Sequence, residues 1–167
     1  MAFEKILGIA ACDPKGVMGS KGKLPWHCPE DLKHFSETTL GSPMVMGYRT
    51  FLSLPARYFD QRMMIVFSHR KLLSDKNLFF VSSLTEFLAL EMASKNLYVI
   101  GGAQIYQLFL QENLIEEFLL TRLKKAYEGD TFFPLFLLNG WASSKIQETD
   151  TFQILRYFRP LRRRICI

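Results

Sequence analysis

The sequence predicts a single-domain α/β fold with a mostly parallel sheet and an antiparallel C-terminal edge. Short apolar strands alternate with helical patterns along residues 6–110, an order that places helices on both faces of a parallel sheet. Residues 6–12 are an uninterrupted apolar run, as expected of a strand buried on both faces. Near the C-terminus three strand patterns follow one another without an intervening helical pattern, which favours antiparallel pairing.

The predicted elements follow in chain order without a linker or an internal repeat. After the first strand and a glycine-rich loop, a helix runs from Pro29 to Gly41, because proline and acids favour a first turn. Ser83 and Glu86 form a capping box that opens a helix reaching Met92. The remaining strands are expected at 44–46, 63–67, 78–81, 97–100, 118–123, 141–147 and 152–158, and the remaining helices at 48–54 and 103–110.

Composition and charge limit the classes of function. The chain has 167 residues and a net charge of +5, and its apolar runs are too short to span a bilayer. Arginines crowd the last twelve residues, so we expect a nearly neutral domain at 1–159 and a solvated basic tail at 160–167. The three cysteines show no C-x-x-C spacing, and Asp13-Pro14 replaces a signal-peptide cleavage site. A cytoplasmic protein in a reducing compartment is expected.

Several familiar kinds of site find no support. The glycines at 16, 19 and 22 do not have the G-x-G-x-x-G spacing of a Rossmann turn, and Pro25 and Trp26 intervene before the helix. The three histidines lack the spacing of zinc ligands, so no metal site is predicted. The sequence also has no G-x-S-x-G nucleophile elbow.

Asp31 has two interpretations. An acid in the first turn of a helix is often a surface residue that stabilises the helix dipole. Its neighbours Leu32 and Phe35 place it at the core edge of the helix instead, where burial raises the pKa of a carboxylate and makes it a candidate functional acid. The residues alone leave both interpretations open.

Three strand ends carry glycine or basic polar residues. Gly101-Gly102 follows a buried strand and precedes a helix, either as a plain turn or as a place where a phosphate approaches the backbone. The segment 46–50 repeats this arrangement with an added cation and hydroxyl, and 68–70 follows the next strand. Because the carboxyl ends of parallel strands share one edge, these segments predict a crevice for a polyphosphate ligand.

Taken together, these segments resemble dihydrofolate reductase. The resemblance covers residues 3–159 in the family's order and rests on motifs that are jointly specific: Leu24-Pro25-Trp26 followed by Asp31, Met46-Gly47 with Thr50, Ile100-Gly101-Gly102, and Glu128-Gly129-Asp130-Thr131 with Phe133-Pro134. It implies an eight-stranded, mostly parallel sheet with four flanking helices. It also implies reduction of 7,8-dihydrofolate to tetrahydrofolate with NADPH, in one-carbon metabolism.

The resemblance implies a role for individual residues. Asp31 would bind the pterin, with Thr121 in the same network, and Gly16 to Leu24 would form a lid loop. The implied catalytic residues are Asp31, Trp26, Leu24, Tyr106 and Thr121. The implied substrate-binding residues are Ile9, Asp31, Phe35, Leu54, Arg62, Ile100 and Thr121. The implied cofactor-binding residues are Ala11, Met18, Gly19, Gly47, Arg49, Thr50, Ser68, His69, Arg70, Ile100, Gly101, Gly102, Ala103, Gln104, Ile105, Tyr106 and Thr131.

Further expectations concern the turn, the substrate tail and the partners. The resemblance implies a cis bond between Gly101 and Gly102, with a Cβ on Gly102 either meeting the cofactor or demanding a forbidden backbone conformation. Tyr48 stands where the family commonly has a basic residue, and a shortened stretch leaves Arg62 or Arg57 to meet the glutamate tail. Expected partners are dihydrofolate and antifolate inhibitors of the diaminopyrimidine and pteridine type, bound to a monomer, with no nucleic acid or membrane.

Two other functions fit the sequence less well. One is a reductase of the same fold that acts on a pyrimidine in riboflavin synthesis, which would not be expected to carry Trp26 with Asp31. The other is a basic RNA-binding module, which needs exposed aromatic residues interleaved with cations. Here the aromatic residues fall mostly on apolar strand and helix faces.

Overall fold

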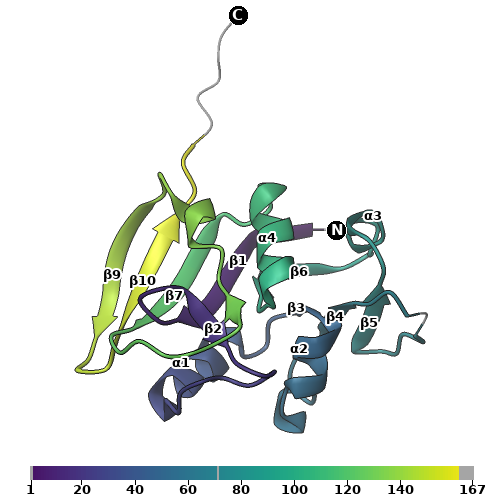
Figure 1. Cartoon of the computed structure of the whole chain (residues 1–167). Helices are drawn as coiled ribbons and strands as arrows, with labels where there is room; N and C mark the ends of the chain where they lie inside the picture. The colour runs from purple at the N-terminus through teal and green to yellow at the C-terminus, as the bar shows by residue number, and fades with distance from the viewer. Residues whose placement is uncertain (1, 71, 162–167) are drawn as a thin grey trace, which may run out of the picture.

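The structure, a computed structural model that describes residues 2–70 and 72–161, is built on one large sheet. Within those residues the sheet has eight strands in the order β5-β4-β3-β6-β1-β7-β10-β9 (Figure 1). The pairs from β5 to β7 are parallel, and β10 pairs antiparallel with β7 and β9, which confirms the predicted sheet. The strands are β1 (Ala2–Cys12), β3 (Met44–Gly47), β4 (Met64–Phe67), β5 (Leu78–Val81), β6 (Ala93–Val99), β7 (Glu117–Leu123), β9 (Ala142–Glu148) and β10 (Phe152–Phe158).

Helices cover both faces of this sheet, as Figure 1 shows. Successive residues of a strand point to opposite faces, and the two apolar cores follow that alternation. Met44 and Met46 lie in the core that includes residues of α1 and α2, whereas Val45 between them lies in the core that includes residues of α3 and α4. In the described part of the chain the four helices are α1 (Pro29–Thr39), α2 (Tyr48–Ser53), α3 (Leu84–Leu88) and α4 (Ala103–Gln111). The four predicted helices are therefore confirmed.

A second, two-stranded sheet was not predicted. It joins β2 (Val17–Gly19) in the glycine-rich loop to β8 (Thr131–Phe132) in antiparallel pairing. Strands of two and three residues are too short to show a period of two in the sequence. The pairing brings the glycine-rich loop against the segment that follows β7, although more than a hundred residues separate them.

The helix that opens at Ser83 is shorter than predicted. Its cap is confirmed, since Ser83 Oγ accepts a hydrogen bond from the Glu86 backbone N–H at 3.2 Å. The helix ends at Leu88 rather than Met92, because the chain turns back and β6 begins at Ala93, where it pairs with β1. Strand pairing with β1 therefore overrides the apolar helical spacing of Met92.

Of the basic tail expected at 160–167, residues 162–167 lie outside the described residues. Across 2–70 and 72–161, none of the helices is long and apolar enough to cross a membrane.

Candidate active site

Asp31 lies at the start of α1 with its side chain turned into the protein. Asp31 is 9 % exposed. Its Oδ1 accepts a hydrogen bond from Thr121 Oγ1 on β7 at 2.7 Å. Burial raises the pKa of the Asp31 carboxyl above its ordinary value, while the Thr121 hydrogen bond and the charge of nearby His34 partly oppose that rise. The surface interpretation of Asp31 is therefore wrong, and the core-edge interpretation is confirmed.

Apolar side chains lie beside this acid. Thr121 pairs with Ala11 in the β1–β7 register, so Asp31 reaches the sheet two residues from Ile9. Ile9 and Ile100 are buried in one cluster, and Phe35 and Leu54 are partly buried against it. Leu24, at the end of the glycine-rich loop, is 50 % exposed.

Two arginines flank Tyr58, and only one of them is buried. Arg62 is 5 % exposed and donates from Nε to Thr39 Oγ1 at 3.1 Å and from a terminal nitrogen to the Ser36 carbonyl at 2.7 Å. Burial lowers the pKa of Arg62 from its usual high value. Arg57 is exposed and donates to the Tyr58 hydroxyl at 3.3 Å. Arg62 is thus the arginine that the fold holds in a fixed position.

The Gly101–Gly102 turn joins the ends of β3 and β6. The peptide bond between the two glycines is cis, as the resemblance implied. The Gly47 N–H donates to the Gly101 carbonyl at 2.8 Å, and the Tyr106 hydroxyl donates to the Ile9 carbonyl at 2.7 Å. Gly101 has φ +118, and a Cβ there would meet Tyr106 at 3.2 Å.

The expected conformational reason for Gly102 is wrong. Gly102 has φ −80, which any residue adopts, and a Cβ there would make only an ordinary contact with Thr50 Oγ1 at 3.6 Å. The backbone requirement for glycine therefore falls on Gly101, where φ is positive.

Basic and hydroxyl side chains follow β3 and β4. Ser68 is buried and its Oγ accepts a hydrogen bond from the Arg70 N–H at 3.1 Å. The Arg70 guanidinium lies 5.7 Å from the centre of the Tyr48 ring, a cation–π distance. Three further predicted residues, Arg49, His69 and Gln104, have exposed side chains. Tyr48 stands where the family commonly has a basic residue. Its ring therefore orients the guanidinium of Arg70.

The glycine-rich loop is held against the segment around Asp130. Asp130 donates its N–H to the Gly19 carbonyl at 3.0 Å, and its Oδ2 accepts the Lys21 N–H at 3.1 Å. Thr131 pairs with Gly19, which joins two of the predicted cofactor residues. Met18, between β2 neighbours, is partly buried against the core that includes α4.

Comparisons with known proteins agree on one family. The family model described as Dihydrofolate reductase matches residues 5–163. Dihydrofolate reductase HdrB of Haloferax volcanii is 34% identical, covering 95% of this chain and 85% of its own length. Dihydrofolate reductase of Neisseria gonorrhoeae is 35% identical, covering 86% of this chain and 88% of its own length.

A solved structure extends the similarity to three dimensions. Dihydrofolate reductase from Enterococcus faecalis, complexed with NADP(H) and RAB-propyl, superposes with a TM-score of 0.78 at 27% identity. The alignment covers 95% of this chain and 99% of that one. This chain belongs to the dihydrofolate reductase family. It is an oxidoreductase that reduces 7,8-dihydrofolate to 5,6,7,8-tetrahydrofolate with NADPH.

The carboxyl edge of the sheet fits the cofactor of a dihydrofolate reductase. The first hydrogen bond of α4 runs from the Tyr106 N–H to the Gly102 carbonyl, so the N–H groups of the first turn before it point out of the helix. These groups and the helix dipole favour a pyrophosphate. A Cβ on Gly47 would meet Ile105 at 3.3 Å, so glycine allows the end of β3 to pack closely against α4.

Sequence reasoning missed two residues that support Trp26. The Trp26 ring lies 5.4 Å from that of Tyr127, and among the described residues its buried Nε1 has no hydrogen-bond partner. Asp13 is completely buried and accepts the Tyr127 N–H at 2.9 Å. Neither contact has a local signal, because the partners lie about a hundred residues apart in the chain.

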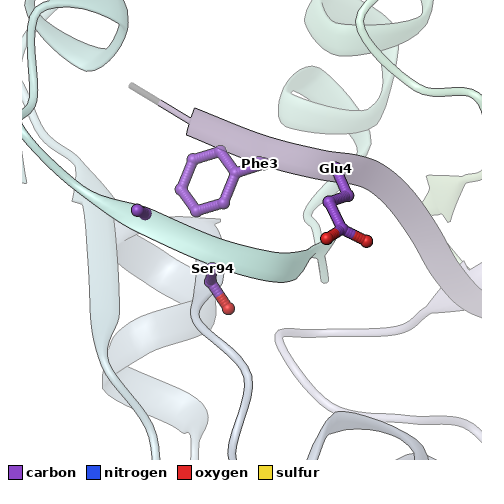
Figure 2. Close-up of a pocket in the computed structure, with 4 residues that line it drawn as sticks. Phe3, Glu4 and Ser94 are labelled. Carbon is purple, nitrogen blue, oxygen red and sulfur yellow. The ribbon is translucent and has the colours of Figure 1, made fainter.

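A hollow elsewhere on the surface does not belong to this reductase site. Figure 2 shows the residues of β1 and β6 that line it, among them Phe3, Glu4 and Ser94. These residues lie near the amino ends of the two strands, whereas Ile100 and Gly101 follow the carboxyl end of β6. Among the described residues no group of three or more His, Cys, Asp or Glu could hold a metal ion.

Proposed function

We propose that Asp31 and Thr121 bind the pterin of dihydrofolate and that Asp31 supplies the charge that promotes its protonation. The observation that carries this proposal is a buried carboxylate hydrogen-bonded to Thr121 Oγ1 at 2.7 Å. The second carboxylate oxygen can accept hydrogen bonds from the pterin N3 and 2-amino group. The hydrogen bond from Thr121, which lies on β7, holds the carboxylate in that orientation.

The ionised form of Asp31 is the active form in this proposal. Burial raises the pKa of Asp31. The hydrogen bond from Thr121 opposes that rise, because it stabilises the ionised carboxylate. A negative charge beside the pterin raises the basicity of N5, which takes its proton from water. NADPH, when bound, supplies the hydride that adds to C6.

Apolar residues and one arginine complete the proposed substrate site. Ile9, Phe35, Leu54 and Ile100 exclude water from the pterin and aminobenzoyl groups, and their shared cluster supports this. Arg62 pairs with the α-carboxylate of the glutamate tail. Its Nε and one terminal nitrogen are anchored to α1, which leaves the other terminal nitrogen for the ligand.

The proposed cofactor site follows the carboxyl ends of β3, β4 and β6. Residues 101–105 bind the pyrophosphate at the N-terminus of α4, and Ile100 and Tyr106 border the nicotinamide. At the adenosine end Ser68 and Arg70 bind the 2′-phosphate, with the Tyr48 ring holding Arg70 in place. Ala11, Met18, Gly19, Gly47, Arg49, Thr50, His69 and Thr131 complete this proposed set.

The lid loop from Gly16 to Leu24 closes over both ligands in this proposal. Trp26 forms the wall on the lid side, next to Ala11, which is partly buried against the same cluster. Antifolates of the diaminopyrimidine and pteridine type bind the Asp31 pocket, because their amino groups supply the donors that a carboxylate accepts. We place the chain in the cytoplasm as a monomer. The free thiols of Cys12 and Cys28, within the described residues, are compatible with a reducing compartment.

One assay tests the proposed function directly. Purified protein is mixed with NADPH and dihydrofolate, and the loss of NADPH absorbance is followed; the same assay is run with NADH. We expect rapid, dihydrofolate-dependent oxidation of NADPH and a lower kcat/KM with NADH, because charge-assisted hydrogen bonds to the 2′-phosphate are lost. Dihydrofolate-independent oxidation, or equal kcat/KM with the two cofactors, would contradict the proposed site.

A further inference from the structure

Asp13 is a buried carboxylate that joins two loops. It follows β1 directly and is completely buried. Its Oδ1 accepts the N–H groups of Lys15 and Val17, each at 2.8 Å, within the turn that leads into the lid loop. Its Oδ2 accepts the N–H of Tyr127 at 2.9 Å, on the segment that follows β7. One carboxylate therefore satisfies donors from segments that are distant in sequence.

The charge of Asp13 is retained despite its burial. Burial alone would raise the pKa of this carboxyl, but the N–H donors of Tyr127, Val17 and Lys15 together hold it below its ordinary value. An ionised carboxylate can accept at both oxygens, whereas a neutral amide can accept at only one. The link between the two loops thus depends on the carboxylate and not only on the size of the side chain.

The bond to Tyr127 leads to the substrate site. The Tyr127 ring lies 5.4 Å from the Trp26 ring at an interplanar angle of 59°, a tilted aromatic contact. Tyr127 and Ala11 are both partly buried against the cluster that contains Trp26. A change in the backbone at Tyr127 therefore moves the ring that supports Trp26.

We propose that Asp13 is a positioning residue that couples the lid loop to Tyr127 and thereby sets the position of Trp26. This inference rests on the proposed role of Trp26 as a wall of the substrate site. Closure of the lid and the placement of the wall are then linked through one side chain, which touches neither substrate nor cofactor.

The variant Asp13→Asn separates this role from general stability. The amide oxygen of Asn can still accept the N–H groups of Lys15 and Val17. In that orientation its NH2 group faces the Tyr127 N–H. Two donors then oppose each other, so the turn is retained while the bond between the loops is lost. Tyr127→Ala removes the ring but keeps the backbone donor, and so it interrupts the same path at its other end.

The experiment uses the full chain with Trp141→Phe, which leaves Trp26 as the sole tryptophan. Steady-state kinetics and Trp26 fluorescence are measured for Asp13→Asn, Tyr127→Ala and the double variant. We expect a shifted Trp26 emission in both single variants and a rise in the KM for dihydrofolate that exceeds the fall in kcat. The two substitutions should be non-additive by about three- to tenfold in kcat/KM, as contacting residues are. The matched control is Asp150→Asn at an exposed turn, which should leave emission and kinetics unchanged.

The possible outcomes separate this inference from the proposed function. Unchanged Trp26 emission in Asp13→Asn, or additive effects of the two substitutions, would overturn it. If Asp13→Asn does not fold, Tyr127→Ala decides alone, and unchanged emission and KM there would overturn the inference. Trp26→Phe tests the underlying role: an unchanged KM in that variant refutes the wall, whereas a raised KM without an effect of Asp13→Asn refutes only the coupling.

Discussion

Asp31 and Asp13 are both buried, and their acidities move in opposite directions. Among the described residues Asp31 accepts one side-chain hydrogen bond, from Thr121, and burial raises its pKa. Asp13 accepts three backbone N–H groups, and these hold its pKa below the ordinary value although burial opposes them. At Asp13 the backbone donors and the charge of Lys15 outweigh burial, whereas at Asp31 the Thr121 donor and the charge of His34 do not. A buried acid with most of its acceptor capacity unused can bind a ligand, whereas one whose two oxygens already accept backbone N–H groups holds its surroundings in place.

The largest expected difference between the two regions is in activity. Asp31→Asn should lower kcat/KM at neutral pH by about 10²–10³-fold, the loss typical for a removed electrostatic contact at a reacting group. The amide cannot supply the negative charge that raises the basicity of N5. Activity should recover in part at low pH, where dihydrofolate arrives already protonated. The measurement is NADPH oxidation across a pH series.

Asp150→Asn is the control for this prediction, because it makes the same chemical change at an exposed turn. It should retain the activity and pH profile of the unmodified chain. Turnover of Asp31→Asn close to that of the unmodified chain at neutral pH would contradict the proposed role of Asp31.

Stability should show the opposite ranking. Asp13→Ala leaves three N–H groups, one buried and two partly buried, without their acceptor and should lower the free energy of unfolding by about 2–4 kcal/mol. Asp31→Asn removes a charge whose burial is unfavourable and should keep or slightly raise that free energy. Urea unfolding at neutral pH measures both. A large loss in Asp31→Asn with little loss in Asp13→Ala would show that donor count does not separate the two sites.

Some elements of this fold could be predicted from the sequence and others could not. The strands of the large sheet and the helices that flank it were predicted because their apolar patterns are local, as in the uninterrupted run at 6–12. The sheet of β2 and β8 was missed, since strands of two and three residues have no period to detect. The end of α3 was misplaced because pairing of Ala93 with β1 outweighs the helical spacing of Met92.

The site was predictable in the same uneven way. Local spacing gave Asp31 two interpretations, and only the contact with Thr121 on another strand decides between them. The roles of Asp13 and Tyr127 could not be inferred, because a hydrogen bond across 114 positions leaves no trace in either segment. The same holds for Tyr48, whose ring lies beside Arg70 only after β3 and β4 pair.

A smaller difference in stability is expected between alanine variants of the two glycines in the Gly101–Gly102 turn. Gly101→Ala should lower the free energy of unfolding by about 1–2 kcal/mol, because L residues rarely adopt its positive φ. The new methyl group would also press on Tyr106 at 3.2 Å. Gly102→Ala is the matched comparison, with an ordinary φ and only an ordinary van der Waals contact for the new methyl group. It should leave apo stability nearly unchanged and weaken NADPH binding, as measured by fluorescence titration. Equal losses of stability would contradict this distinction.

The smallest expected effect is in how stability depends on pH. The ordinary pKa of both carboxyls is 3.8 in the unfolded chain. Asp13 has a lower pKa when folded, so the stability it contributes is present above pH 3.8 and is lost as the pH falls through that lower value. Asp31 has a higher pKa when folded, so it costs stability as the pH rises from 3.8 through its raised value, and the cost is constant above that. The unfolding free energies of Asp13→Asn and of Asp31→Asn, each minus that of the unmodified chain, should therefore change over adjacent pH ranges. The former difference should become less negative on acidification below pH 3.8, and the latter more positive as the pH rises above it, each by about 1.4 kcal/mol per unit of pKa shift. Two differences that change over the same pH range would show that the acids share one environment.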